Sequence, residues 1–122
     1  MEETVKYFNH EQYLEIIFTG ERCYEAFNDS IEKVFNECQK MDIQRILLDG
    51  SGAKGDWKEF DRFQVGKLVS QFFGEQYKIL GVDKEAKINR FAENTAFNRG
   101  VNILVTHDKK AGLNWLLKMN RD

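Results

Sequence analysis

The sequence predicts one α/β domain over residues 1–122: a mixed, largely parallel sheet of about five strands, with an N-terminal β-hairpin and about four flanking helices. Two short segments of alternating hydrophobicity open the chain, which is typical of paired strands. Beyond them, short apolar runs alternate with amphipathic stretches, the order that produces parallel strands joined by helices. The 122 residues, 42% of them apolar, are enough to bury one core.

The hairpin is predicted from residues 4–9 and 13–19. Val5 and Tyr7 share one side of the first segment, and the residues at positions 9–12 (Asn-His-Glu-Gln) suit a turn. In the second segment, alternate positions place three apolar side chains on one face: Leu14, Ile16 and Phe18.

The next two elements are a helix over residues 23–41 and a strand over residues 45–49. Apolar residues recur every three or four positions in the first: Tyr24, Phe27, Ile31, Val34, Phe35, Cys38 and Met41. The second is a short apolar run that ends in turn residues, as in a strand buried on both faces.

Residues 50–55 are rich in glycine and are predicted to form a turn that permits positive φ angles. Asp56 and Glu59 have capping-box spacing for a second helix, which Gly74 ends. Gly66 lies on the core face of that helix, which favours close approach to the sheet. The predicted core residues of this helix are Phe60, Phe63, Val69, Phe72 and Phe73.

The remaining elements alternate in the same way. Residues 78–82 are predicted to form a strand, residues 88–99 a helix closed by Gly100, and residues 101–106 the last strand. Asp108 is the expected cap of a final helix that continues to about Met119.

Composition argues against several classes of protein. No apolar run is long enough to span a membrane, the first residues do not resemble a secretory signal, and an acidic pI of about 5.7 disfavours nucleic-acid binding. Cys23 and Cys38, about 22 Å apart on one predicted helix, cannot form a disulfide. Free thiols fit a reducing compartment, so we expect a cytoplasmic protein without a zinc site.

Polar residues gather where the predicted parallel strands end, which is where ligands bind in open α/β sheets. They are the candidate ligand or partner rim: Asp49, Ser51, Asp83, His107 and Asp108. Three carboxylates there could hold magnesium for phosphoryl transfer. Loop and helix-cap roles explain the same residues, and the spacing fits no phosphoryl-transfer motif, so we expect no catalytic residue, metal or cofactor.

Two further segments are open to two interpretations. Arg99, also a candidate residue of the ligand or partner rim, precedes the helix-ending Gly100, where it favours the helix dipole or is offered to an anionic partner. The final helix is apolar over more than one face, which predicts either an interface formed by Leu113, Trp115 and Leu117 or a helix buried on both flanks.

Three segments resemble the small bacterial SpoIIAA-like domains of the STAS superfamily. They are residues 46–49 (Ile-Leu-Leu-Asp), residues 91–100, which end in Asn-Arg-Gly, and residues 111–116, which end in Trp-Leu. The resemblance implies a sheet flanked by helices. It also implies a non-enzymatic regulator that binds proteins or nucleotides.

One family feature is missing. In the anti-sigma factor antagonists of the superfamily, a serine at a helix start is phosphorylated within an Asp-Ser-Ser/Thr-Gly-Leu-like motif. The matching helix start here, residues 56–60, has no hydroxyl, and Ser51 lies five residues earlier in the loop. The phosphoserine role is therefore not assigned to Ser51.

These observations predict a regulatory or protein-interaction module that self-associates, as a dimer, through the final helix. The alternative is a carrier or sensor of a small apolar or amphipathic ligand, a hypothesis supported by the likeness of SpoIIAA-like domains to the lipid-binding CRAL-TRIO fold. Its pocket would be a cavity of about 300 Å³ or more, formed by the loop before the second helix and by the aromatic residues of that helix: Phe60, Phe63, Phe72 and Phe73. A third hypothesis is a metal-dependent phosphoryl-transfer enzyme that uses Asp49, Asp83 and Asp108.

Overall fold

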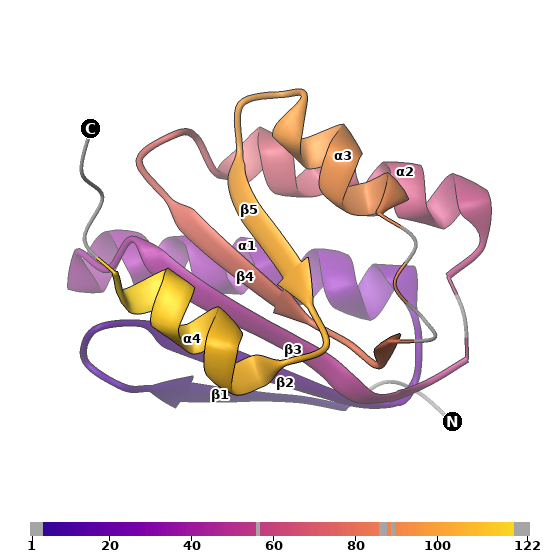
Figure 1. Cartoon of the computed structure of the whole chain (residues 1–122), viewed down its shortest axis with the longest axis horizontal. Helices are drawn as coiled ribbons and strands as arrows, with labels where there is room; N and C mark the ends of the chain where they lie inside the picture. Colours follow the sequence, from indigo (N-terminus) through magenta and orange to yellow (C-terminus); the bar gives the residue numbers. More distant parts are fainter. Residues whose placement is uncertain (1–3, 56, 86–87, 89, 119–122) are drawn as a thin grey trace.

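The computed structural model describes residues 4–55, 57–85, 88 and 90–118 (Figure 1). Strands and helices follow the predicted order. The elements are β1 (Thr4–Asn9), β2 (Leu14–Glu21), α1 (Tyr24–Met41), β3 (Arg45–Lys54), α2 (Glu59–Phe72), β4 (Lys78–Val82), α3 (Phe91–Phe97), β5 (Asn102–Thr106) and α4 (Lys109–Leu117).

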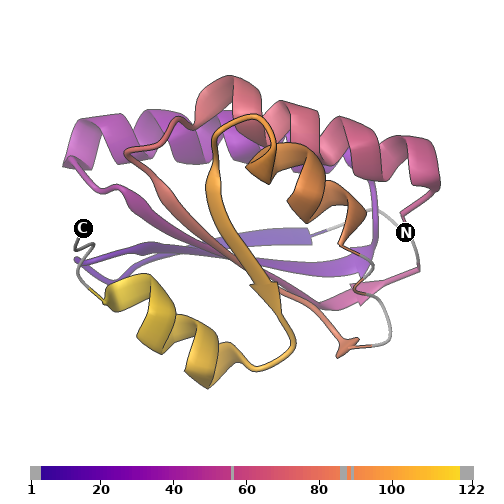
Figure 2. The same ribbon diagram turned by 45° about the horizontal axis from the view of Figure 1, so that its top comes forward.

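The strands lie in the sheet in the order of the sequence, β1-β2-β3-β4-β5. Only the β1–β2 pair is antiparallel, and the other three pairs are parallel. Because strand–helix–strand connections are right-handed and each strand is added on the same side, the connecting helices must cover one face. Figure 2 shows α1, α2 and α3 on that face and α4 alone on the other. The predicted fold class is confirmed.

The two faces of the sheet bury unequal cores. The larger cluster lies under α1, α2 and α3 and includes Ile16, Ile31, Ile46 and Ile79, all fully buried. The smaller cluster contains four buried residues under α4: Leu47, Leu80, Val82 and Leu116. In the described part of the chain, no helix combines the length and apolar character that a membrane span requires.

Strand β3 is longer than predicted. It continues through most of the glycine-rich segment, where Gly52, Ala53 and Lys54 pair with the end of β2. Among residues 50–55, only Gly55 has a left-handed φ, at 82°. The predicted turn therefore shrinks to the residues after Lys54, because the backbone pairing with β2 outweighs the low strand preference of glycine.

Helix α2 begins and packs differently from the prediction. Its N-cap is Lys58, without a side-chain cap, so the predicted capping box is wrong; Asp56 itself lies outside the described residues. Phe60 is 67% exposed rather than in the core, whereas Val69 and Phe73 are each 2% exposed. Phe60 is in the first turn, where the helix projects beyond the sheet (Figure 1).

Helix α3 is shorter than predicted, since it starts at Phe91 and not at residue 88. Arg90, at its N-cap, has a left-handed φ of 67°, which no helical residue adopts. At the other end Gly100 closes the helix as predicted, with a φ of 92° and its N–H donating to the carbonyl of Phe97 at 3.0 Å.

Helix α4 starts as predicted, because the Asp108 carboxylate accepts a hydrogen bond from the N–H of Ala111 at 3.0 Å. It ends at Leu117, and Met119 lies outside the described residues. Gly112 faces the sheet so closely that a Cβ there would lie 2.7 Å from Cδ1 of Leu80. The close approach of α4 to the sheet therefore depends on a glycine at position 112.

We expect Gly112→Val to lower the free energy of unfolding by about 2 kcal/mol, because its side chain would overlap buried Leu80. Asn114→Val, at an exposed position of the same helix, should change it by less than about 0.5 kcal/mol. Denaturant unfolding of both variants measures the difference. Equal effects would contradict the close seating of α4.

Candidate functional site

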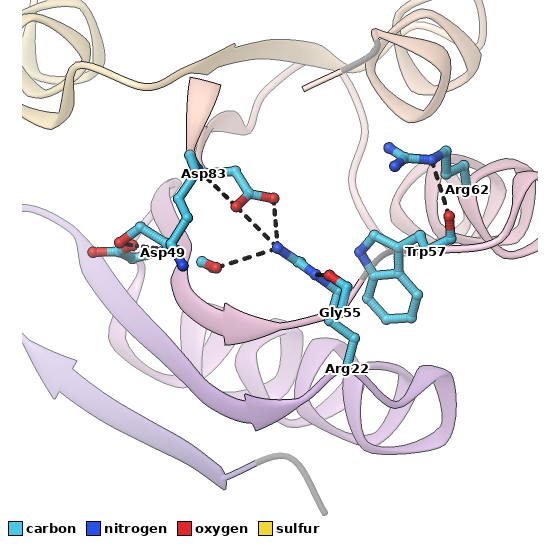
Figure 3. Close-up of polar contacts among 9 residues, drawn as sticks. Arg22, Asp49, Gly55, Trp57, Arg62 and Asp83 are labelled. Carbon is cyan, nitrogen blue, oxygen red and sulfur yellow. Dashed lines mark hydrogen bonds and ion pairs between the residues drawn. The ribbon is translucent and has the colours of Figure 1, made fainter. Parts of the chain in front are cut away.

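A buried arginine joins the loops at the carboxyl ends of the strands (Figure 3). Arg22 follows β2 directly, and its Nη2 donates to both carboxylate oxygens of Asp83, which follows β4, at 2.9 and 2.8 Å. Its Nε donates to the carbonyl of Gly55, after β3, at 2.9 Å. One guanidinium therefore connects the segments that follow three neighbouring strands.

The ion pair is largely removed from water. The side chains of Arg22 and Asp83 are 7% and 18% exposed. Trp57 lies beside them, with the Arg22 guanidinium carbon 5.9 Å from its ring centre, and Nε of Arg62 donates to the Trp57 carbonyl at 3.2 Å. These contacts connect Trp57 to Arg22 and to helix α2.

A cavity of about 120 Å³ lies among these residues, between the sheet and helices α2 and α3. Its wall includes Arg22, Trp57 and Asp83. Helix α3 contributes Glu93 and Ala96. The other wall residues are mainly apolar: Phe18, Phe27, Leu48, Val65, Val69, Val82, Ile103 and Val105.

The cavity does not match the one predicted for a ligand carrier. Its volume of about 120 Å³ is well below the 300 Å³ expected, and is close to that of an apolar cavity which holds one benzene ring. The loop before α2 contributes Trp57 to the wall, as predicted, but the predicted contribution of the α2 aromatic residues is wrong. None of Phe60, Phe63, Phe72 and Phe73 lines it, and the wall residues from α2 are Val65, Gly66 and Val69.

Asp49 and Ser51 lie on the opposite face of the sheet, away from Asp83. The Asp49 carboxylate is buried and accepts from the Ser51 hydroxyl at 2.6 Å and from Nζ of Lys109, on α4, at 2.8 Å. The same ammonium donates to buried Glu15 of β2 at 2.6 Å, and His10 lies 2.7 Å from the other Glu15 oxygen. Lys109 thus bridges two carboxylates of the sheet.

This bridge determines the charge of Asp49. Burial raises the pKa of its carboxyl, but hydrogen bonds from Lys109 and Ser51 outweigh burial and hold the pKa below its usual value. Burial likewise lowers the pKa of Lys109, and hydrogen bonds to Asp49 and Glu15 reverse the effect and hold it above its usual value. Both groups are therefore charged at neutral pH.

The other predicted rim residues are separate from both places. Asp108 caps α4, and exposed His107 lies 4.0 Å from Glu85. Arg99 is exposed after α3, with its guanidinium carbon 5.8 Å from the ring centre of Phe63. The rim is thus distributed over several sites, and no three potential ligands among the described residues are grouped to hold a metal ion.

The candidate interface residues on α4 are half-buried. Leu113 and Trp115 pack against the smaller core, and Nζ of Lys78 lies 4.5 Å from the ring centre of Trp115. Lys78 also donates to the carbonyls of Trp115 and Lys118 at the C-terminus of α4. Burial lowers the pKa of this lysine, and the charges of Arg45 and Lys118 add to the effect. Trp115 therefore has a structural role, and Leu117 is also half-buried.

Arg22 and Lys109 are the important residues that sequence reasoning missed. The criterion that selected Asp83, its place at the carboxyl end of a strand, also selects Arg22 once β2 is counted among the parallel strands. Lys109 carried no such signal, because its carboxylate partners are 94 and 60 residues away in the sequence.

No family model matches the sequence, and no curated protein matches it significantly. Several solved structures are similar to it, including the following two. An anti-sigma factor antagonist from Mycobacterium paratuberculosis superposes with a TM-score of 0.72 at 12% identity, over 96% of each chain. An uncharacterized protein of the DUF3478 family with a SpoIIAA-like fold, from Shewanella loihica PV-4, gives a TM-score of 0.56 at 16% identity over 93% of each. The chain thus has the SpoIIAA-like fold, as the resemblance predicted.

Breaking the buried ion pair should be costly. We expect Asp83→Ala to lower the free energy of unfolding by about 3 kcal/mol, because it leaves a buried guanidinium without its counter-charge. In a double-mutant cycle with Arg22→Ala, the two changes should couple by more than about 1 kcal/mol. The exposed pair Glu37–Lys40 is the control, with coupling below about 0.5 kcal/mol. Equal coupling in the two pairs would contradict the account.

The Lys109 bridge should give a pH-dependent effect. Since the folded-state pKa of Asp49 lies below the unfolded value of about 3.9, its contribution is complete above that pH and is lost as the pH falls through the folded pKa. We expect Lys109→Met to lower the free energy of unfolding by about 1–3 kcal/mol at pH 7, a range discounted because the lysine is partly exposed.

That deficit should shrink at pH 3, because below the unfolded-state pKa of about 3.9 the stabilisation by ionised Asp49 is progressively lost. Urea unfolding at both pH values measures it. Lys110→Met, at an exposed neighbouring position, should have little effect at either pH. A deficit that is equal at pH 7 and pH 3 would show that the carboxylates do not depend on Lys109.

Proposed function

We propose that the protein is a regulatory, non-enzymatic protein-interaction module of the STAS-like type, and that its partner docks at the carboxyl ends of β2, β3 and β4. Likeness to an anti-sigma factor antagonist supports this class of function at the level of fold. The observation that carries the proposal is the small apolar cavity beneath the Arg22–Asp83 ion pair.

The size of the cavity favours a side chain over a free ligand. Pockets for small molecules commonly measure about 300–1,000 Å³, whereas about 120 Å³ suffices for one aliphatic or aromatic side chain. Protein interfaces often depend on such an anchor, inserted into an apolar pocket and shielded from water by its surroundings. We therefore assign the cavity to one apolar residue of the partner.

The wall of the cavity is organised before binding. The guanidinium of Arg22 already has Asp83 and Gly55 as partners, so it does not have to be ordered or neutralised when a partner arrives. Preorganisation of this kind lowers the entropy lost on association. Because its charge is balanced by Asp83, the site selects an apolar anchor rather than an anion.

Two exposed aromatic rings lie on the helices that form the cavity. Phe60 of α2 is 67% exposed and Phe97 of α3 is 64% exposed, the two highest values among the large apolar side chains described. Both helices also contribute cavity residues, such as Val65 and Ala96. A partner that covers the cavity and either helix would remove this apolar surface from water.

The two cysteines suit a cytoplasmic regulator. Cys23 and Cys38 are both free thiols, as predicted. Burial raises the pKa of Cys38 to about 12, so this thiol is unreactive at neutral pH. Free thiols are typical of proteins in reducing compartments.

Photo-crosslinking tests the docking site. The protein would carry benzoyl-phenylalanine at position 60 or 97 and be added to an extract of the cells that naturally produce it. We expect it to form a discrete crosslinked adduct with one protein. The same group at exposed Lys40, on α1, should not form one. Val65→Phe, which fills the cavity while leaving both positions exposed, should reduce the adduct at least tenfold.

The folded state of the Val65→Phe variant is checked by thermal unfolding, so that loss of the adduct reports on docking. An adduct unaffected by the filled cavity would contradict the anchor. An equal adduct from position 40, or none from any position, would contradict the docking site.

A further inference from the structure

The two edge strands of the sheet, β1 and β5, differ in the hydrogen bonding of their outward-facing backbone groups. At the β5 edge, the N–H of Val105 donates to Oε2 of Glu93 at 2.9 Å, and its carbonyl accepts from Nη1 of Arg90. Arg90 and Glu93 are themselves an ion pair of 2.7 Å at the start of α3. Side chains therefore occupy the N–H and carbonyl of Val105, through which another strand would pair at the middle of this edge.

The β1 edge has no such protection. Strand β1 pairs with β2 on one side only, so every second residue directs its N–H and carbonyl away from the sheet. Among the described residues, no group outside β2 forms a hydrogen bond with the backbone of Val5–Phe8. In Figure 1, β1 forms the outer border of the sheet.

The side chains around this edge are unusually apolar for a solvent-facing strand. Tyr7 is 40% exposed and Phe8 43%, on opposite faces of the sheet, and Met41 of α1 is 44% exposed. Beside them, a groove of about 200 Å³ lies between β1 and α1. Its floor contains core residues: Leu14, Ile16 and Val34.

We propose that two copies of the chain pair antiparallel along β1, about a two-fold axis perpendicular to the sheet, to form one continuous sheet. This surface is distinct from the docking site proposed at the carboxyl ends of β2, β3 and β4. Such an interface is isologous, so the strand must be complementary to itself. The sequence of β1 allows this test to be made residue by residue.

Side-chain alternation restricts the register. Residues opposite each other in an antiparallel pair point to the same face, so odd positions must pair with odd positions. Near full overlap, the axis can then pass only through Lys6, Tyr7 or Phe8. An axis at Lys6 would place two ammonium groups directly opposite each other. An axis at Phe8 would leave Val5 beyond the end of the other strand.

The axis at Tyr7 satisfies both requirements. Lys6 then lies opposite Phe8 of the second copy, which allows cation–π contact, and Tyr7 lies opposite Tyr7. Val5 lies opposite Asn9, whose Nδ2 is 3.2 Å from Sδ of Met41, so the second copy covers that end of the groove. Nζ of Lys33 lies 4.5 Å from the Tyr7 ring centre and fixes the ring near the axis.

This complementarity is the reason to assign the edge to a second copy rather than to an unrelated peptide. The charge that would oppose self-pairing, Lys6, meets an aromatic ring instead of another cation. The exposed apolar side chains on both faces of β1 are covered in the same event. A different extended peptide remains the occupant to be distinguished by experiment.

Single-cysteine variants test the register of the proposed β1–β1 pair directly. In a Cys23→Ser background, with Cys38 buried, a cysteine on the axis lies opposite itself with Cα atoms about 4.5–5.5 Å apart, within reach of a disulfide. We expect Tyr7→Cys to give mostly dimer under mild oxidation, and Lys6→Cys and Phe8→Cys to give at least fivefold less. Preferential crosslinking at position 6 or 8, or at none, would overturn the proposed pairing.

Sedimentation of the reduced protein gives an independent test. The wild-type chain should be dimeric at about 100 µM, and Phe8→Asp should make it monomeric. Phe60→Asp, which places the same charge at another exposed ring, should leave the dimer intact. A monomeric wild-type chain would overturn the proposal, and so would a dimer that Phe8→Asp leaves intact and Trp115→Asp dissociates. Neither measurement depends on the partner proposed for the carboxyl edge.

Discussion

The order of the strands is the constraint on which the rest of the structure depends. Because the strands are added to one side in sequence order and each crossover is right-handed, three helices must share one face of the sheet. The same order brings the carboxyl ends of β2, β3 and β4 side by side, where Arg22 joins their loops to Asp83 and Gly55. It also leaves β1 and β5 as edges, and within the part of the chain that the structure describes, side chains bond to the outer backbone groups of Val105 in β5 but not to those of Val5–Phe8 in β1.

The second face depends on a short helix with a small apolar contact. Helix α4 buries only Gly112 and Leu116, so polar contacts at its two ends carry much of its attachment. Lys109 connects its first turn to two carboxylates of the sheet, and Lys78 reaches from β4 to the carbonyls of its last turn. These residues are therefore part of the architecture, which explains why Asp49 is buried without belonging to the docking site.

The hydrophobic periodicity predicted every strand and helix in order. An element that is buried on one face or on both faces shows this as a pattern of apolar residues within a few positions of the sequence. The errors of the prediction arise from long-range contacts. The glycine-rich segment joins β3 because β2 offers backbone partners more than 30 residues away, and Phe60 is exposed because α2 projects beyond the sheet. Asp83, His107 and Asp108 follow β4 and β5, as the sequence indicated. Asp49 and Ser51 lie within β3, because that strand is longer than predicted, and Asp49 and Asp83 belong to separate networks. Family resemblance predicted the fold without locating the cavity, whose wall combines residues from most of the chain.

The proposed function places recognition at one edge of the sheet and self-association at another, so that neither surface hides the other. Docking at the carboxyl ends of β2, β3 and β4 is tested most directly by amide hydrogen exchange of the protein, measured free and bound to the partner identified by crosslinking. The account predicts slower exchange at residues 50–55 and in the first turns of α2 and α3, with α4 unchanged. Protection confined to α4, with the carboxyl edge exchanging as in the free protein, would contradict it.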